Sequence, residues 1–218
     1  MINRRAAVIS AVLILVMCAA GIWALLIIPA GARVAVHFDA AGHADGWSNG
    51  VRAFFTLPVL AAVIWGVMAL LPRIDPRGDN LARSAAAYGT LWIAIIAFLC
   101  VQQGSLIARS QHIELPVARV HAAMIGALFI VIGNVLGKIR PNYFLGIRTP
   151  WTLADEHVWD QTHRFGGWAF VAAGALLLVA GFAAPQATPA AALTLPVILA
   201  LALGVTVKSY LLWKQHHR

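Results

Sequence analysis

Six long apolar stretches, separated by short polar segments, dominate the hydrophobic pattern of this sequence. A helix needs roughly 20 residues to cross the hydrocarbon core of a bilayer, and each stretch comes close to or exceeds that length. The stretches lack the alternation of a barrel strand, and backbone groups in lipid must be paired within a helix or a closed barrel. The pattern therefore predicts an all-α integral membrane protein, a bundle of six transmembrane helices near Ala6–Ile28, Ala53–Leu71, Ala85–Ile107, Arg119–Val135, Phe165–Ala184 and Ala190–Leu212.

Composition supports a membrane protein and excludes several other classes. The chain of 218 residues is 61% hydrophobic and 11% charged, whereas soluble domains are about 45–50% apolar and about 25% charged. So few charged side chains cannot cover a water-soluble globule of this size. The net charge of +8 comes from basic residues scattered between the apolar stretches, which argues against a direct nucleic-acid partner and leaves the lipid bilayer as the expected surroundings.

The distribution of Lys and Arg predicts that both termini are cytoplasmic. Cytoplasmic loops are enriched in these residues, and this orientation leaves only Arg33, Arg52, Arg109 and Arg119 on the outer side. The first stretch follows basic residues, as a signal peptide does. However, its apolar run is longer than a signal core and five further stretches follow, so we interpret it as a transmembrane helix.

Two connecting loops are long enough to be structured. The outer loop, residues 29–52, contains the alternating run RVAVHF, which is typical of a short strand, followed by glycine-rich turns. The inner loop spans residues 137–164. We expect an N-terminal segment over residues 1–75, with two helices and the outer loop, and a C-terminal four-helix segment over residues 85–218. The connector PRIDPRGDNLARS between them is interpreted as a solvated hairpin.

Within the inner loop, the sequence predicts the start of a helix. Pro150 disfavours helix just before it, and Thr152 is followed by Asp155 and Glu156, a pattern close to a capping box. We expect a helix from about Leu153 that continues into the fifth stretch. Tryptophan side chains suit the headgroup region, so Trp151 and the next tryptophan, Trp159, are expected to anchor the loop at the membrane surface. A connector that is only anchored in this way remains an alternative to a recognition surface.

Few polar side chains lie within the apolar stretches. Gln102 and Gln103 fall near the outer end of the third stretch, opposite His121 of the fourth, and are expected either to line a small polar vestibule or to bond neighbouring helices. No acidic residue lies mid-membrane, which argues against a proton-coupled transporter. Gly133 and Gly137 form a GxxxG pair that predicts close approach of the fourth and fifth helices.

The outer loop contains the one candidate metal site, and it is weak. His37 and Asp39, followed by His43 and Asp45, are types that hold Zn²⁺, with His37 and His43 as the candidate ligands. Turn formation explains the same residues. No motif for a catalytic nucleophile, phosphate loop or other cofactor is present, so we expect a protein that is not an enzyme and has no cofactor. The alternative is a metal-dependent membrane enzyme or a small-solute transporter that uses this His/Asp cluster.

The sequence from Gly133 to Gly167 resembles the signature of the SdpI family of bacterial membrane immunity proteins. The resemblance is long and ungapped, and so is more specific than a short motif. The candidate site residues that carry it are Asn134, Arg140, Pro141, Asn142, Gly146, Arg148, Thr149, Pro150, Trp151, Thr152, Trp159, Thr162 and His163. The outer-loop sequence VHFDAAGHADGW is similar to the domain of unknown function that often precedes the SdpI segment. There His37, Phe38, Gly42, Asp45 and Gly46 fit the pattern, Asp39 replaces a more usual asparagine, and Trp47 follows.

The resemblance implies a multi-pass protein of the bacterial cytoplasmic (inner) membrane that confers immunity. It implies that a secreted peptide toxin is bound outside or that its membrane target is occluded. It also implies a second role in signal transduction, in which a small transcriptional repressor is held at the membrane from inside. Arg148 and Asn142 are expected to orient the inner loop by hydrogen bonds.

Overall fold

A computed structural model describes residues 3–39, 43–113, 115–183 and 190–217 of the chain. Gly42 of the outer-loop resemblance and the basic residue Arg218 lie outside them. The elements are, in chain order, α1 (Arg4–Ile27), β1 (Arg33–Phe38), β2 (Ala44–Asn49), α2 (Gly50–Ile74), α3 (Gly78–Arg83), α4 (Ala85–Ser110), α5 (Val117–Leu136), α6 (Pro150–Ala154), α7 (Glu156–Ala183) and α8 (Ala190–His216).

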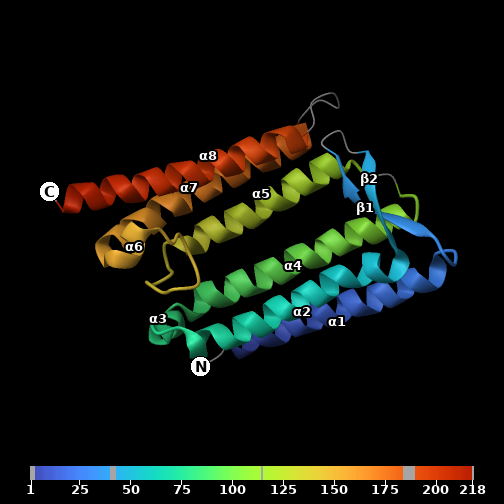
Figure 1. The fold of residues 1–218 in the computed structure, drawn as a ribbon, viewed down its shortest axis with the longest axis horizontal. Helices are drawn as coiled ribbons and strands as arrows, with labels where there is room; N and C mark the ends of the chain where they lie inside the picture. Colours follow the sequence, from blue (N-terminus) through green and yellow to red (C-terminus); the bar gives the residue numbers. More distant parts are fainter. Residues whose placement is uncertain (1–2, 40–42, 114, 184–189, 218) are drawn as a thin grey trace.

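The predicted six-helix membrane bundle is confirmed. Within the described residues, six helices, α1, α2, α4, α5, α7 and α8, are long and apolar enough to span a membrane. They run side by side, and both chain ends lie at one end of the bundle with α3 and α6, whereas β1 and β2 lie at the other (Figure 1). We call these the terminal end and the hairpin end.

The six helices pack as two groups of three. Helices α1, α2 and α4 pack against one another around Trp92 and Ile96, both fully buried. Helices α5, α7 and α8 form the second group, and α4 with α5 joins the two groups (Figure 1). Helix α4, which the predicted division of the chain assigns to the C-terminal segment, therefore packs mainly against the N-terminal helices. The division at residues 75–85 remains a prediction.

Glycines with seven-residue spacing allow α5 and α7 to pack closely. A Cβ atom on Gly133 would lie 2.6 Å from the carbonyl oxygen of Gly167, and one on Gly126 would lie 2.6 Å from that of Gly174. Contacts this short exclude any side chain, so the two backbones approach each other directly. The predicted approach at Gly133 is confirmed. A Cβ atom on Gly137 would make ordinary contacts with α7, the nearest with Arg164 at 3.7 Å. Both glycines of the GxxxG pair therefore face α7, but only Gly133 lies too close for a side chain.

The outer loop forms an antiparallel hairpin. The predicted strand RVAVHF is β1, and it pairs with β2 in a register that shifts on either side of His37. Gly46 lies opposite His37, where a Cβ atom would lie 2.7 Å from the histidine Cβ. Val34 is buried against the helices, whereas Trp47 on β2 is 51% exposed. The hairpin therefore covers the ends of the helices and presents an aromatic side chain outward.

Candidate functional site

The inner loop is folded around the side chain of Asn142. In residues 137–155, which we call the signature loop, Asn142 is 1% exposed. Its Oδ1 accepts hydrogen bonds from the backbone N–H groups of Phe144 (2.9 Å) and Leu145 (2.7 Å). Its Nδ2 donates to the carbonyls of Arg140 (2.9 Å) and Leu145 (3.1 Å). One amide side chain thus satisfies four backbone groups that no helix or sheet pairs.

His163 of α7 fastens the next part of the loop. Its ring is 1% exposed, and Nε2 accepts a hydrogen bond from the N–H of Ile147 at 3.0 Å. The ring is therefore neutral, with its proton on Nδ1, which donates to the carbonyl of Trp159 at 2.9 Å. Gly146 passes against this ring with φ +105°, and a Cβ atom there would overlap sterically with Nε2. Both the backbone conformation and the contact require glycine.

Trp159 is buried, contrary to the prediction that it anchors the loop at the membrane surface. Its side chain has 0% exposure, and its Nε1 donates to the carbonyl of Ile139 at 2.8 Å. The ring stacks on His163 with centroids 4.0 Å apart. Because its N–H has a protein partner, the indole needs no headgroup water. Trp151 is half-buried and packs against Tyr210 of α8 at 5.1 Å.

A short helix, α6, followed by the long helix α7, replaces the single helix predicted from Leu153. Thr149 caps α6, and its Oγ1 accepts from the N–H of Thr152 at 3.2 Å while the hydroxyl of Thr152 bonds the Thr149 N–H at 2.9 Å. Helix α6 ends at Ala154, and Asp155 then caps α7 through the N–H groups of His157 and Val158. The loop does contain a capping box, but it is formed by Thr149 and Thr152. Asp155 is the N-cap of a second helix, α7. Thr149 also donates to Ser209 of α8 at 3.0 Å.

The connector between α2 and α4 holds the signature loop, so its interpretation as a simple solvated hairpin was wrong. Asp75 is buried and accepts from the backbone N–H of Tyr143 at 3.0 Å. Asn80 of α3 donates to the carbonyl of Pro141 at 2.8 Å. Ser84 accepts from the N–H of Arg140 at 2.9 Å. Three polar side chains of this connector therefore bond the loop that joins α5 to α7.

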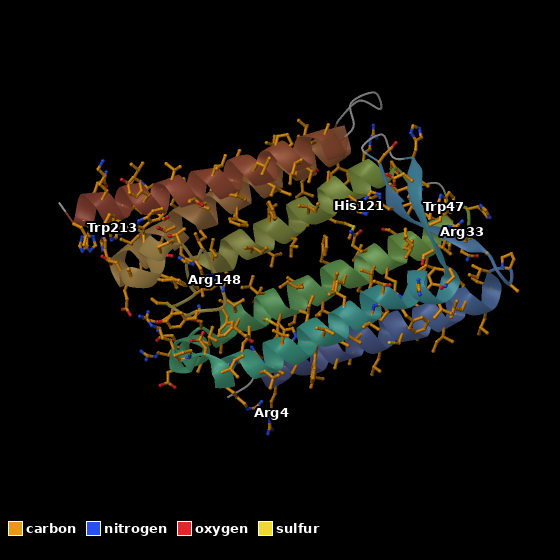
Figure 2. All side chains as sticks on the ribbon, in the orientation of Figure 1. Arg4, Arg33, Trp47, His121, Arg148 and Trp213 are labelled. Atoms are coloured by element: carbon orange, nitrogen blue, oxygen red, sulfur yellow. The ribbon has the colours of Figure 1, made fainter. Side chains whose placement is uncertain are left out.

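The exposed face of the signature loop carries charged and aromatic side chains. Arg148 is exposed and donates to the carbonyl of Tyr143 at 2.8 Å, so Arg148 and Asn142 both orient the loop as predicted. Figure 2 shows Arg148 at the terminal end of the bundle. The guanidinium of Arg77 lies 5.5 Å from the ring of Tyr143 and 3.6 Å from the carboxylate of Glu156. This face can bind a partner through charge and hydrogen bonds.

Other predicted signature residues are structural or only locally bonded. Asn134 is exposed on α5, and its Nδ2 donates to the carbonyl of Ile130 at 2.9 Å in the same helix. Pro141 and Thr162 are buried, whereas Arg140 and Pro150 are exposed. The Thr162 hydroxyl is buried with no hydrogen-bond partner among the described residues.

Asp155 also meets the end of α8. The Nε2 atoms of His216 and His217 each lie 3.7 Å from Asp155 Oδ2. Burial alone raises the pKa of this carboxyl, but the N–H groups of Val158 and His157 and the two histidines outweigh it, so the pKa of Asp155 is lowered from its ordinary value. The carboxylate thus stays ionised as the cap of α7.

At the hairpin end, the candidate metal ligands form two separate pairs. His37 Nδ1 lies 2.5 Å from Asp45 Oδ1, and His43 Nδ1 lies 3.4 Å from Asp39 Oδ2. The backbone N–H of His43 also donates to Asp39 Oδ1 at 2.8 Å. In the part of the chain that the structure describes, no group of three or more His, Cys, Asp or Glu residues has the arrangement of a metal site. Each pair supplies fewer than the three or four ligands typical of zinc.

A cavity of about 320 Å³ lies beside the hairpin, between α2, α4 and α5. Its polar lining includes Gln102, Ser105 and Arg109 of α4 and His121 of α5, and Figure 2 shows His121 at this end of the bundle. The predicted vestibule therefore contains Gln102 and His121. Gln103 faces the other way and donates to the carbonyls of Met17 (2.8 Å) and Phe54 (3.2 Å), which bonds α4 to α1 and α2.

Comparisons with known proteins match both parts of the chain. Residues 138–217 match the SdpI/YfhL protein family, and residues 12–62 match the domain of unknown function DUF1648. The chain is 31% identical over 88 residues to "Immunity protein SdpI" of Bacillus subtilis (strain 168), which is 40% of this chain and 42% of that relative. The chain thus matches less than half the length of this relative. No solved structure matches the chain. The C-terminal part, which carries most of the signature loop together with α6, α7 and α8, therefore matches the SdpI/YfhL protein family, in a multi-pass bacterial membrane protein with a DUF1648 match before it.

Proposed function

We propose that this protein confers immunity to a secreted peptide toxin, by binding it or by occluding the membrane site on which it acts. The observation that carries the proposal is the family match over the signature loop, together with a relative that is named an immunity protein. Binding alone suffices for such a role, so the protein needs no catalytic centre. Because the match covers part of each chain, the activity itself is inferred and requires its own test.

The hairpin end is the side that meets the toxin in this proposal. Lys and Arg collect at the terminal end, which the positive-inside rule assigns to the cytoplasm of the bacterial inner membrane. The hairpin then faces outward and presents Trp47, which is 51% exposed. Exposed aromatic side chains beside polar groups are typical of protein-binding surfaces. His37, Asp39, His43 and Asp45 shape this surface through the two pairs described above.

The terminal end is the side that would hold a small transcriptional repressor. The signature loop is fixed from beneath by Asn142 and His163, while Arg148, Glu156 and Asp160 remain exposed. A rigid loop with exposed charges loses little conformational entropy when a partner binds. This signalling role is a second part of the proposal and does not depend on the first.

The test of immunity is survival of a sensitive bacterial host exposed to culture supernatant from a toxin-producing strain. Expression of the full chain is expected to raise survival, and Trp47→Ala is expected to reduce the protection. Trp23→Ala is the matched control, because Trp23 is 54% exposed on α1 and lies outside the hairpin. Equal survival with and without the chain would contradict the proposal, and equal loss in both variants would contradict the assignment of Trp47.

Zinc content tests the alternative of a metal-dependent enzyme or solute carrier. The two separate His/Asp pairs predict that detergent-purified protein contains less than one zinc per chain and that His37→Ala leaves this content unchanged. Stoichiometric zinc that is lost in His37→Ala would favour the alternative. Measurement by inductively coupled plasma mass spectrometry decides between the two.

A further inference from the structure

The cavity at the hairpin end is positively charged and has polar atoms without partners. Arg52 and Arg109 both line it, and none of the described residues in its lining is acidic. Arg109 Nε and Gln102 Oε1 are buried and have no hydrogen-bond partner among the described residues. A buried polar atom left unpaired costs free energy, because it has lost its water without gaining another partner. An occupant that pairs with these atoms would recover that free energy.

Phe38 of the hairpin orients the Arg109 side chain. The guanidinium carbon lies 3.9 Å from the centre of the Phe38 ring. A ring at this distance occupies one face of the guanidinium and leaves the N–H groups along its edge free to donate. Those N–H groups match the oxygens of a phosphate group in geometry and charge.

An apolar hollow lies next to the cavity, deeper along the same two helices. It has a volume of about 230 Å³ and is lined by Ala94, Ala97, Phe98 and Val101 of α4 and by Met124, Ala127, Leu128 and Val131 of α5. On α4, Val101 is followed at once by Gln102 of the cavity, and on α5 Met124 lies one turn from His121. The seam between α4 and α5 therefore has a cationic part near the membrane surface and an apolar part toward its middle.

We infer that this seam binds an anionic phospholipid of the bilayer, with its phosphate at Arg109 in the cavity and one acyl chain in the apolar hollow. The order of cationic and apolar surfaces along the seam is the order of headgroup and tail in a lipid. Basic pockets between transmembrane helices recognise anionic headgroups by the same chemistry. The inference concerns a lipid site and does not depend on immunity to a toxin.

Native mass spectrometry of the delipidated full chain in detergent tests the inference. Phosphatidylglycerol is the anionic probe and phosphatidylcholine is the neutral one. One phosphatidylglycerol per chain is expected, bound at least about tenfold more tightly than phosphatidylcholine, because a charge-assisted hydrogen bond contributes about 1.5–3 kcal/mol. Equal binding of the two lipids would overturn the inference. Tight binding of dodecanoate without binding of phosphatidylglycerol would overturn it as well, since the site would then take free fatty acids.

Two variants separate the headgroup from the tail. Arg109→Gln is expected to abolish the preference for phosphatidylglycerol, whereas the matched control Arg33→Gln, at the same end but outside the cavity, is expected to retain it. Ala97→Trp fills the apolar hollow and is expected to weaken binding of phosphatidylglycerol about tenfold. Wild-type binding in Arg109→Gln or in Ala97→Trp would refute the assigned position. A second folded variant, Arg109→Lys, keeps the charge and is expected to retain part of the preference.

Discussion

Replacing Asn142 with alanine removes four hydrogen bonds from the signature loop at once. The two N–H groups of Phe144 and Leu145 lose their acceptor, and the carbonyls of Arg140 and Leu145 lose their donor. A typical hydrogen bond contributes about 0.5–1.5 kcal/mol net, so four of them sum to about 2–6 kcal/mol. Water can reach part of the loop after the change, which favours the lower half of this range. This loss is large enough to unfold the loop locally without unfolding the bundle.

Asn134→Ala is the matched control. Asn134 belongs to the same sequence signature, but it is exposed and makes one bond to a carbonyl of its own helix. Its replacement is expected to change stability by less than about 0.5 kcal/mol, as for other surface substitutions. Comparison of the two variants thus tests whether a signature residue must hold the loop in place, as Asn142 does, for its loss to destabilise the loop.

Hydrogen–deuterium exchange of the purified protein measures how well the backbone amides of the loop are protected. In Asn142→Ala, amides of residues 140–148 are expected to exchange about 30-fold faster or more, which corresponds to about 2 kcal/mol, while those of α5 and α7 stay protected. In Asn134→Ala the same amides are expected to exchange as in the wild type. If Asn142→Ala leaves the loop protected, or Asn134→Ala exposes it equally, the account of how this loop is held is wrong.

Three further outcomes follow from the geometry. Gly146→Ala is expected to destabilise the loop by about 2 kcal/mol or more in a thermal-shift assay, because its positive φ disfavours alanine and the new Cβ meets His163. The control Gly66→Ala, where nothing lies within 4 Å of the new Cβ, is expected to be neutral or stabilising in the same assay. Gly133→Ala is expected to separate α5 from α7 and lower the melting temperature, and a melting temperature equal to that of Gly66→Ala would contradict the glycine contact. The lowered pKa of Asp155 means that its contribution is fully present above the ordinary value of 3.8 and is lost as the pH falls through the lower folded-state pKa. Melting temperatures of wild type and Asp155→Asn are therefore expected to differ at neutral pH and to converge only as the pH falls below the ordinary pKa and through the lower folded-state pKa, and a constant difference would contradict this assignment.

Hydropathy was sufficient to predict the six helices but not which helices pack against one another. Each helix in lipid is apolar on most sides, so its sequence does not show which face meets another helix. This is why α4 could be assigned to the C-terminal segment by sequence, although it packs against α1 and α2. The approach of α5 and α7 was predicted through Gly133, but the pairing with Gly167 and Gly174 follows a seven-residue spacing that a search for GxxxG does not detect.

The sequence identified the residues of the candidate site better than it identified the residues that bond to them. Asn142 and Arg148 orient the loop as the sequence indicated, because polar residues in a turn bond nearby backbone groups. Asp75, Asn80 and Ser84 were missed, since their partners lie about 60 residues away along the chain and no local pattern signals such contacts. The one available signal was their polar character at the ends of apolar helices, which solvent explains equally well.

The bonds from Asp75, Asn80 and Ser84 on one side, and from Thr149 to Ser209 on the other, join both helix groups through a single loop at the terminal end. At the opposite end, the two groups meet across a cavity with polar atoms still unpaired. This arrangement predicts that the two helix groups can rotate relative to each other about the terminal end, so that their separation changes mainly at the hairpin end. An occupant that enters between the two groups at the hairpin end is expected to change the angle between them, and the hydrogen bonds at the terminal end would resist that change.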